Sequence, residues 1–299
     1  MTPPPIQTSG RSTLAILLVL FAMFTFAVMD GLTKLLSQTL PIPQILWVRN
    51  VVFTCLAVAL LVQHTKGRSL LTLAHSERPL LQTFRALLLV VESGVFMVAF
   101  KLMPIADVHA VNAVAPLLVV AMSVPFLGEK VGPRRWAAVL VGFVGVLLII
   151  RPGFEKIEPP VLIALAGAAM WALYQILVRL CSRVDRAETT TLYTALVGLG
   201  ATTLVGPAAW MRPDATQWAM LAAIAIMGSV SHIALIKALG MTQPALLQPY
   251  SYTLFIWAVV VGYLMFGHVP DNWTLAGAAI IIASGLYVWH RERVRAAEK

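Results

Sequence analysis

The sequence predicts an all-α integral membrane protein with ten transmembrane helices, formed as two inverted five-helix repeats. Hydrophobic residues make up 59% of the 299 residues, and only 12% are Asp, Glu, Lys or Arg, whereas soluble domains contain about 25% of these charged residues. The mean hydropathy is +0.84. A soluble protein of this size exposes too much surface to bury so many apolar side chains. The composition therefore indicates a membrane protein.

Ten apolar runs are long enough to be read as membrane spans, since a helix needs about 20 residues to cross the hydrocarbon core. The first run is longer than a signal-peptide core and is not followed by a visible cleavage site, so we read it as a permanent span. The ten expected spans cover approximately residues 13–35, 44–63, 79–100, 104–126, 134–151, 160–181, 189–210, 217–237, 243–266 and 273–289.

Basic residues are distributed unequally between the two sides of this expected topology. If the N-terminus is cytoplasmic, fifteen Lys and Arg residues fall on the inner side and six on the outer side, with Arg85 inside the third span. Cytoplasmic loops of membrane proteins are enriched in Lys and Arg. We therefore expect a multi-pass protein of the cell inner membrane with both termini in the cytoplasm, which an even number of spans requires.

The first and second halves of the chain resemble each other in sequence. The stretch "AFKLMPIADVHAVNAVAPLLVV" from Ala99 aligns with "LIKALGMTQPALLQPYSYTLFI" from Leu235, and "FLGEK" from Phe126 aligns with "MFGHV" from Met265. The expected repeats are residues 1–152 and 153–299, which form one membrane domain. Five spans are an odd number, so the second repeat enters the membrane in the opposite direction. Inverted repeats with interrupted helices at corresponding positions are typical of transporters, whose binding site lies near the midplane.

Several segments resemble a known family. "LWVRN" at residues 46–50, the fourth expected span ending in Pro and then Gly-Glu, and "WAAVLVGFVGVLLIIRPG" at the fifth are similar to the drug/metabolite transporter superfamily, in its ten-span EamA-type branch. The resemblance covers nearly the whole chain and is closest to bacterial amino-acid exporters of the aromatic type. One departure is that Gly267 and His268 stand where the family often has Gly-Glu, so the glutamate of that pattern is present only as Glu129.

The resemblance implies export of small zwitterionic metabolites, amino acids and in particular aromatic ones, by alternating access around a central cavity. An exchanger of nucleotide-sugars or other metabolites, as in other branches of the superfamily, is the alternative. A channel is a further alternative function. An intramembrane enzyme is disfavoured, because the sequence contains no HExxH, no GxSxG and no paired aspartates of intramembrane proteases. No catalytic residue, cofactor or metal site is expected.

Polar residues that interrupt the fourth, sixth and ninth spans are the candidates for binding the substrate. Broken backbone is tolerated in a membrane only where protein or a water-filled cavity satisfies it, and we expect this cavity between the fourth and ninth spans. Helical spacing places the candidates of the fourth span on one face and those of the sixth span on one face, and in the ninth span Gln248 and Tyr252 lie four residues apart with Tyr250 between them. A satisfied buried histidine or an aromatic packing residue would leave the same pattern. The candidates are His109, Asn112, Trp171, Tyr174, Gln175, Gln248, Tyr250 and Tyr252.

Two carboxylates within the expected spans, Asp30 and Glu92, are candidates for energy coupling, because intramembrane charges are costly and usually functional. The structural alternative is that Asp30 pairs with Lys34 one turn later and that Glu92 pairs with Arg85 on the same face. Arg49 is expected near the outer interface, where its long side chain would reach the headgroups.

The expected partners are an amino-acid substrate and membrane lipid, with which the net charge of +9 is compatible. Nucleic acid is not expected. Small residues in the fifth and tenth spans permit close helix contact, and the sequence leaves open whether these two spans pack on each other or form a homodimer surface. These small residues are Ala138, Gly142, Gly145, Gly277, Ala279, Ala283 and Gly285.

Overall fold

A computed structural model describes residues 10–64, 75–128, 132–150, 159–241 and 244–297, and within these ranges every regular element is helical. The helices are α1 (Gly10–Leu36), α2 (Ile42–His64), α4 (Pro79–Leu102), α5 (Ile105–Asn112), α6 (Ala115–Leu127), α7 (Pro133–Ile150), α8 (Pro159–Cys181), α9 (Ala187–Thr203), the short 3₁₀ helix η1 (Pro207–Ala209), α10 (Ala215–Met241), α11 (Pro244–Ser251), α12 (Thr253–Phe266) and α13 (Asn272–Ala297). Glu129 lies outside the described residues.

Eight of the ten expected spans are matched by helices long and apolar enough to cross a membrane within the described ranges. The run expected at 134–151 forms a shorter apolar helix, Trp136–Ile150. The run expected at 189–210 is interrupted, because α9 ends at Thr203 and η1 follows it. Gly206 and Pro207 lie at this point; proline lacks the backbone N–H that would continue a helix.

The fourth and ninth expected spans are each divided into two helices, as their sequences predict. In the fourth, α5 and α6 are separated at Ala113 and Val114. Pro116 explains this break, because its ring excludes a helical hydrogen bond to the carbonyl of Asn112. In the ninth, α11 and α12 are separated at Tyr252. Both composite spans then end on a left-handed glycine, Gly128 with φ 69° and Gly267 with φ 65°, a conformation that a side chain would strain.

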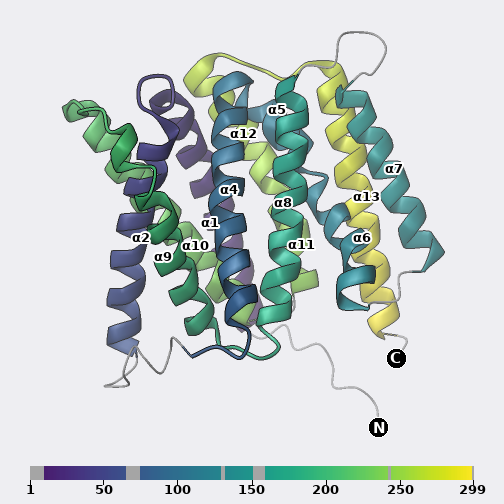
Figure 1. The fold of residues 1–299 in the computed structure, drawn as a ribbon. Coiled ribbons are helices and arrows are strands. Elements are labelled where there is room, and N and C mark those ends of the chain that lie inside the picture. The colour runs from purple at the N-terminus through teal and green to yellow at the C-terminus, as the bar shows by residue number, and fades with distance from the viewer. Residues whose placement is uncertain (1–9, 65–74, 129–131, 151–158, 242–243, 298–299) are drawn as a thin grey trace.

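The helices form a bundle in which the most extensive packing is between α1 and α10, α7 and α13, and α4 and α8. Figure 1 shows α7 and α13 side by side at one edge and α2 with α9 at the opposite edge. Helix α1 begins and helix α13 ends at the same end of the bundle. Large apolar side chains such as Leu17, Val91 and Leu147 are exposed on the outside, which is the surface that lipid tails would cover.

Helices α7 and α13 approach each other through glycine. A Cβ atom built on Gly145 would lie 2.6 Å from the carbonyl oxygen of Gly277, and one on Gly277 would lie 2.6 Å from the carbonyl oxygen of Gly145. These two glycines of the expected small-residue stripe therefore pack the fifth and tenth spans within one chain. Ala279 and Ala283, on the same stripe, are exposed.

Candidate functional site

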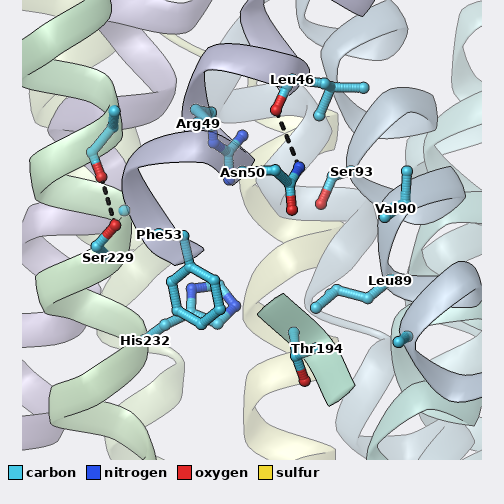
Figure 2. A pocket seen from close by; sticks show the side chains of 13 residues that line it. Leu46, Arg49, Asn50, Phe53, Leu89, Val90, Ser93, Thr194, Ser229 and His232 are labelled. Carbon is cyan, nitrogen blue, oxygen red and sulfur yellow. Dashed lines mark hydrogen bonds between the residues drawn. The ribbon is translucent and has the colours of Figure 1, made fainter. Parts of the chain in front are cut away.

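A cavity lies between α2, α4, α9 and α10, at about the middle of the three longer helices (Figure 2). Its volume is about 60 Å³, enough for water molecules. Apolar groups contribute the larger part of its wall, and polar groups contribute the rest. The lining residues are Leu46, Arg49, Asn50, Phe53, Ala86, Leu89, Val90, Ser93, Thr194, Ala225, Gly228, Ser229 and His232.

Arg49 does not lie at the outer interface, where the sequence places it; it lines the cavity. In the described part of the chain, its guanidinium makes no hydrogen bond or ion pair within bonding distance. The carboxylates of Asp30 and Glu92 are nevertheless close enough to act on its charge. A guanidinium carries five N–H donors and remains protonated in proteins. Arg49 is therefore a permanent positive charge with unused donors facing the cavity.

Asp30 pairs with His109 and not with Lys34. The Oδ2 atom of Asp30 lies 3.1 Å from Nε2 of His109, and both residues are buried. This contact joins α1 to α5 just before the break in the fourth span. Lys34 instead donates from Nζ to the carbonyl oxygens of Phe100 at 2.5 Å and Met103 at 2.7 Å. It thus satisfies carbonyls at the end of α4, where a cation also complements the helix dipole.

Glu92 is buried, at 6% exposed, and does not pair with Arg85. The hydroxyl of Ser93 donates to its Oε2 at 3.3 Å. Its backbone neighbours Ser93, Leu89 and Val90 line the cavity. The carboxylate therefore lies directly behind the wall of the cavity and acts on Arg49 through space.

Arg85 is completely buried and binds neutral groups of three helices. Its Nε donates to Oε1 of Gln82 at 3.2 Å, Nη1 to the hydroxyl of Tyr174 at 3.2 Å, and Nη2 to the carbonyl oxygen of Thr190 and the hydroxyl of Thr194. The direction of the side chain explains why Arg85 does not pair with Glu92. Arg85 shares a face of α4 with Glu92, seven residues later, but its side chain extends toward the N-terminus of the helix and so away from Glu92.

Asp185, in the loop between α8 and α9, completes this network at the end of the bundle. Its Oδ2 accepts from the hydroxyl of Ser76 at 2.5 Å and from Nε2 of Gln82 at 2.8 Å, and its Oδ1 accepts from the backbone N–H of Glu77. Burial alone would raise the pKa of Asp185, but these hydrogen bonds, with the charge of His75, hold the pKa below its ordinary value. The carboxylate therefore ties the start of α4 to the α8–α9 loop in its ionised form.

We expect Asp185→Asn to lower the melting temperature of the detergent-purified protein by a few degrees at neutral pH. The amide has one acceptor oxygen in place of two, so either the backbone N–H of Glu77 or the two donors from Ser76 and Gln82 lose their acceptor, at about 1 kcal/mol for a partly exposed site. A depressed carboxyl pKa contributes stability above the unfolded pKa and loses it as pH falls through the folded value. The difference from wild type should therefore vanish in acid. Glu188→Gln, an exposed substitution at the start of α9, is the control and should show no such trend.

None of the seven predicted binding residues whose side chains the structure describes lies in the wall of this cavity. His109 pairs with Asp30. Trp171 and Tyr174 stack with ring centroids 5.4 Å apart, and Tyr174 accepts from Arg85. Gln175 and Tyr250 are half-buried, and the side chain of Gln248 lies outside the described residues.

Asn112 and Tyr252 each have a buried oxygen without a hydrogen-bond partner in the described structure. The hydroxyl of Tyr252 points at α13, where it occupies the space that a Cβ on Gly285 would take. Tyr252 therefore packs against α13 and not against the cavity wall. Next to these spans, His268 lies 3.4 Å from the carboxylate of Asp107.

Sequence reasoning missed Arg49, Asn50, Phe53, Thr194 and Ser229 as cavity residues. A signal was present in "LWVRN", where a cation and an amide interrupt an apolar span. Such residues inside a membrane usually face the bundle interior. Within the described residues, no cluster of three or more His, Cys, Asp or Glu side chains could hold a metal ion.

Comparison with known proteins places these features among transporters. A model of the EamA-like transporter family matches residues 13–151 and 159–289. A solved crystal structure that is 21% identical covers 93% of this chain and 95% of its own, with a TM-score of 0.61. That likeness concerns the fold.

Three similar proteins differ in the compound that they carry. The S-adenosylmethionine uptake transporter of Rickettsia conorii is 27% identical, over 73% of this chain and 74% of that protein. The riboflavin transporter of Vibrio cholerae is 30% identical, over 64% and 65%. The pseudopaline exporter CntI of Pseudomonas aeruginosa is 25% identical, over 90% and 93%. The resemblance to amino-acid exporters in particular is thus not repeated in these names.

Proposed function

Since this chain belongs to the EamA-like transporter family, we propose that it moves small zwitterionic metabolites across the cell inner membrane by alternating access. These metabolites are amino acids or their derivatives. The relatives reported above are transporters and not enzymes. The observation that carries the proposal is the cavity with polar and charged walls between α2, α4, α9 and α10. Polar groups are costly inside a membrane unless they serve a binding site or a pathway.

The cavity lies between the two segments that the family model matches. Helices α2 and α4 belong to residues 13–151, and α9 and α10 belong to residues 159–289. A site at the junction of two halves is the arrangement expected of a transporter built from repeats. The cavity is smaller than the roughly 300 Å³ or more that ligand pockets usually have. The two halves therefore have to separate for a metabolite to enter.

The packing of the helices supports a division into two related halves at about residue 152. The spans of each half are numbered one to five. Helix α1, the first span of the first half, packs on α10, the third span of the second half. In the same way α8, the first span of the second half, packs on α4, the third span of the first half. The pairs α1 with α12 and α8 with α6 are related in the same way. The pairs α2 with α9 and α7 with α13 each join equivalent spans. Exchange of this kind is what a two-fold repeat predicts.

We propose that the end of the bundle at which α1 begins and α13 ends faces the cytoplasm. The charge count of the sequence favours this orientation by the positive-inside rule. The described residues at that end include Arg179, Arg183 and Arg186. With this orientation, Asp185 and its hydrogen bonds lie on the cytoplasmic side.

Amino-acid derivatives fit the comparisons as well as the cavity, since S-adenosylmethionine, named for one relative, is itself an amino-acid derivative. The direction of transport differs among the relatives, which are named for uptake as well as for export. We propose export for this chain. A nucleotide-sugar requires several cations around its phosphates. The described wall holds one permanent cation, Arg49, so the zwitterionic class is favoured.

Flux into and out of proteoliposomes tests this function. Labelled tryptophan, threonine, S-adenosylmethionine, riboflavin and a nucleotide-sugar are loaded in parallel. We expect saturable flux of at least one amino acid or amino-acid derivative, and acceleration by unlabelled substrate on the opposite side. Flux of the nucleotide-sugar or riboflavin alone contradicts the proposed substrate class. Unsaturable flux without acceleration indicates a channel.

We expect Glu92→Gln to slow transport about tenfold and to flatten its dependence on pH. The reason is that a buried carboxylate next to the cavity, under the influence of Asp30 and Arg49, is placed to take up a proton during the cycle. Initial rates are measured over a series of pH values on both sides. Glu77→Gln removes an exposed carboxylate and should leave the profile unchanged. An unchanged rate and profile in Glu92→Gln would show that Glu92 does not couple transport to protons.

A further inference from the structure

We propose that Arg49 binds the carboxylate of the transported molecule, so that the cavity selects compounds bearing a single carboxylate next to an apolar or aromatic body. The inference rests on the proposed function and adds to it the residue and the chemical group that are recognised. Arg49 has hydrogen-bond donors without a protein acceptor in the described structure, whereas most other polar groups of the cavity wall bond within their own helices.

The other hydrogen-bond donors of the wall are mostly occupied by their own helices. Nδ2 of Asn50 donates to the carbonyl oxygen of Leu46, the hydroxyl of Ser229 to that of Ala225, and the hydroxyl of Thr194 to that of Thr190. Figure 2 shows the first two of these bonds running along the helices and Arg49 with no such bond. The unused donors of the wall are therefore concentrated on one guanidinium, whose planar shape matches a carboxylate through two parallel hydrogen bonds.

Arg85 provides an internal comparison, because it is the second arginine in the same region. Its guanidinium is saturated by Gln82, Tyr174, Thr190 and Thr194, and it does not line the cavity. One arginine thus holds helices together through neutral acceptors, whereas Arg49 is left without a protein acceptor in the described structure. Arg49 is half-buried, so a ligand in the cavity can reach its donors and supply the acceptor that the protein does not.

The charges behind the wall favour a carboxylate over a phosphate. Asp30 and Glu92 both act on Arg49 through space, so part of its charge is already offset before a ligand enters. A single anionic charge can be accommodated there, whereas a phosphate with about two negative charges at neutral pH would be repelled by both carboxylates. No carboxylate belongs to the described wall itself, which leaves the approach to Arg49 open to an anion.

The remaining wall fits an apolar body. The rings of Phe53 and His232 make an edge contact with centroids 6.2 Å apart, and Phe26 makes a second edge contact with His232 at 5.2 Å. Leu46, Leu89 and Val90 complete the apolar surface of the cavity. Aromatic rings and aliphatic groups bury an apolar or aromatic substituent favourably. The arrangement therefore joins an anion site to an apolar surface.

The test compares ligands that differ only in the carboxylate. Tryptophan is compared with tryptophanamide and tryptamine, and S-adenosylmethionine with its decarboxylated form, as competitors and as transported compounds in proteoliposomes. In wild type we expect the carboxylate compounds to be preferred by about tenfold to hundredfold, the range for hydrogen bonds to a charged group. Arg49→Gln should abolish this preference, and Arg49→Lys should keep part of it, because lysine retains the charge without the paired donors.

Arg212→Gln is the matched control, since Arg212 is an exposed arginine outside the cavity, and it should transport as wild type does. Size-exclusion profiles and melting temperatures establish that each variant is folded, and the ratio of acid to amide is read within one variant, so that its expression level cancels. Equal transport of acid and amide by wild type would overturn the inference, and so would an unchanged preference in Arg49→Gln. Flux of only the nucleotide-sugar, lost in Arg49→Gln, would assign a phosphate to Arg49 instead.

The two proposals fail in different ways. Absence of amino-acid and S-adenosylmethionine flux in wild type contradicts the proposed function, whatever the variants do. Saturable flux in wild type that is indifferent to the carboxylate, or to Arg49, retains the function and removes Arg49 as the binding group.

Discussion

Gly145→Ala is expected to destabilise the protein by about 2 kcal/mol or more, although alanine is the better helix former. The added Cβ would lie 2.6 Å from the carbonyl oxygen of Gly277 and 2.8 Å from Cγ1 of Ile281. One of these atoms belongs to the backbone of α13 and cannot move aside as a flexible side chain does. Overpacking of a tight contact typically costs 1–3 kcal/mol, and here the whole α7–α13 interface would have to separate.

Gly200→Ala is the matched control for this steric effect. Nothing lies within 4 Å of a Cβ at Gly200, which is exposed in α9, so alanine should be neutral or stabilising there by up to about 1 kcal/mol. The two variants are compared by thermal unfolding in the same detergent. The reciprocal change Gly277→Ala should resemble Gly145→Ala. Equal melting temperatures for Gly145→Ala and Gly200→Ala would show that α7 and α13 do not touch through these glycines.

Asp30→Asn is expected to reduce the maximal transport rate about tenfold or more, while the protein remains folded. The amide has the shape of the carboxylate and can still hydrogen-bond Nε2 of His109, 3.1 Å away in wild type. What it removes is the negative charge that acts on Arg49. An anion at Arg49 should then be held more tightly and released more slowly, so that KM and kcat fall together.

Asp30→Leu separates charge from hydrogen bonding in this prediction. Leucine leaves the buried Nε2 of His109 without its partner, and we expect a loss of stability of about 1.5–3 kcal/mol, the value of a hydrogen bond to a charged group. Asp214→Asn, at an exposed carboxylate before α10, serves as the control. Steady-state flux gives KM and kcat, and thermal unfolding gives stability. An unaltered KM in Asp30→Asn would mean that Asp30 does not influence the binding of substrate.

Most of the membrane-spanning helices could be predicted from hydropathy, because lipid excludes polar groups and each span is therefore a continuous apolar stretch of the sequence. The interruptions in the fourth and ninth spans were visible as well, since Pro116 and Pro249 disrupt helical hydrogen bonding wherever they occur. The end of α9 at Thr203 was not, because the residues after it are almost as apolar as those before. Hydropathy measures the preference for lipid and contains little information about where a helix stops.

The faces of the helices were harder to predict than their positions. Helix α2 is apolar on nearly all sides, so no periodicity shows that Arg49 points inward. The pairing of Glu92 with Arg85 was wrong for a related reason: seven residues of spacing place two side chains on one face, but Tyr174, Thr190 and Thr194 come from other helices. Partners of this kind depend on which helices become neighbours, which a single sequence does not state.

The side-chain amide of Gln82 determines how the network around Arg85 can come apart. Its Nε2 donates to Oδ2 of Asp185 and to the hydroxyl of Thr190, and its Oε1 accepts from Arg85. Turning the amide over would bring its NH₂ against the guanidinium and its oxygen against the carboxylate, so only one orientation satisfies both ends. Helix α4 can therefore dock on α9 and the loop before it in one register only. Because the bonds of Nε2 to Asp185 and Thr190 are lost together when these segments separate, this end of the bundle should open in a single all-or-none step instead of sliding gradually.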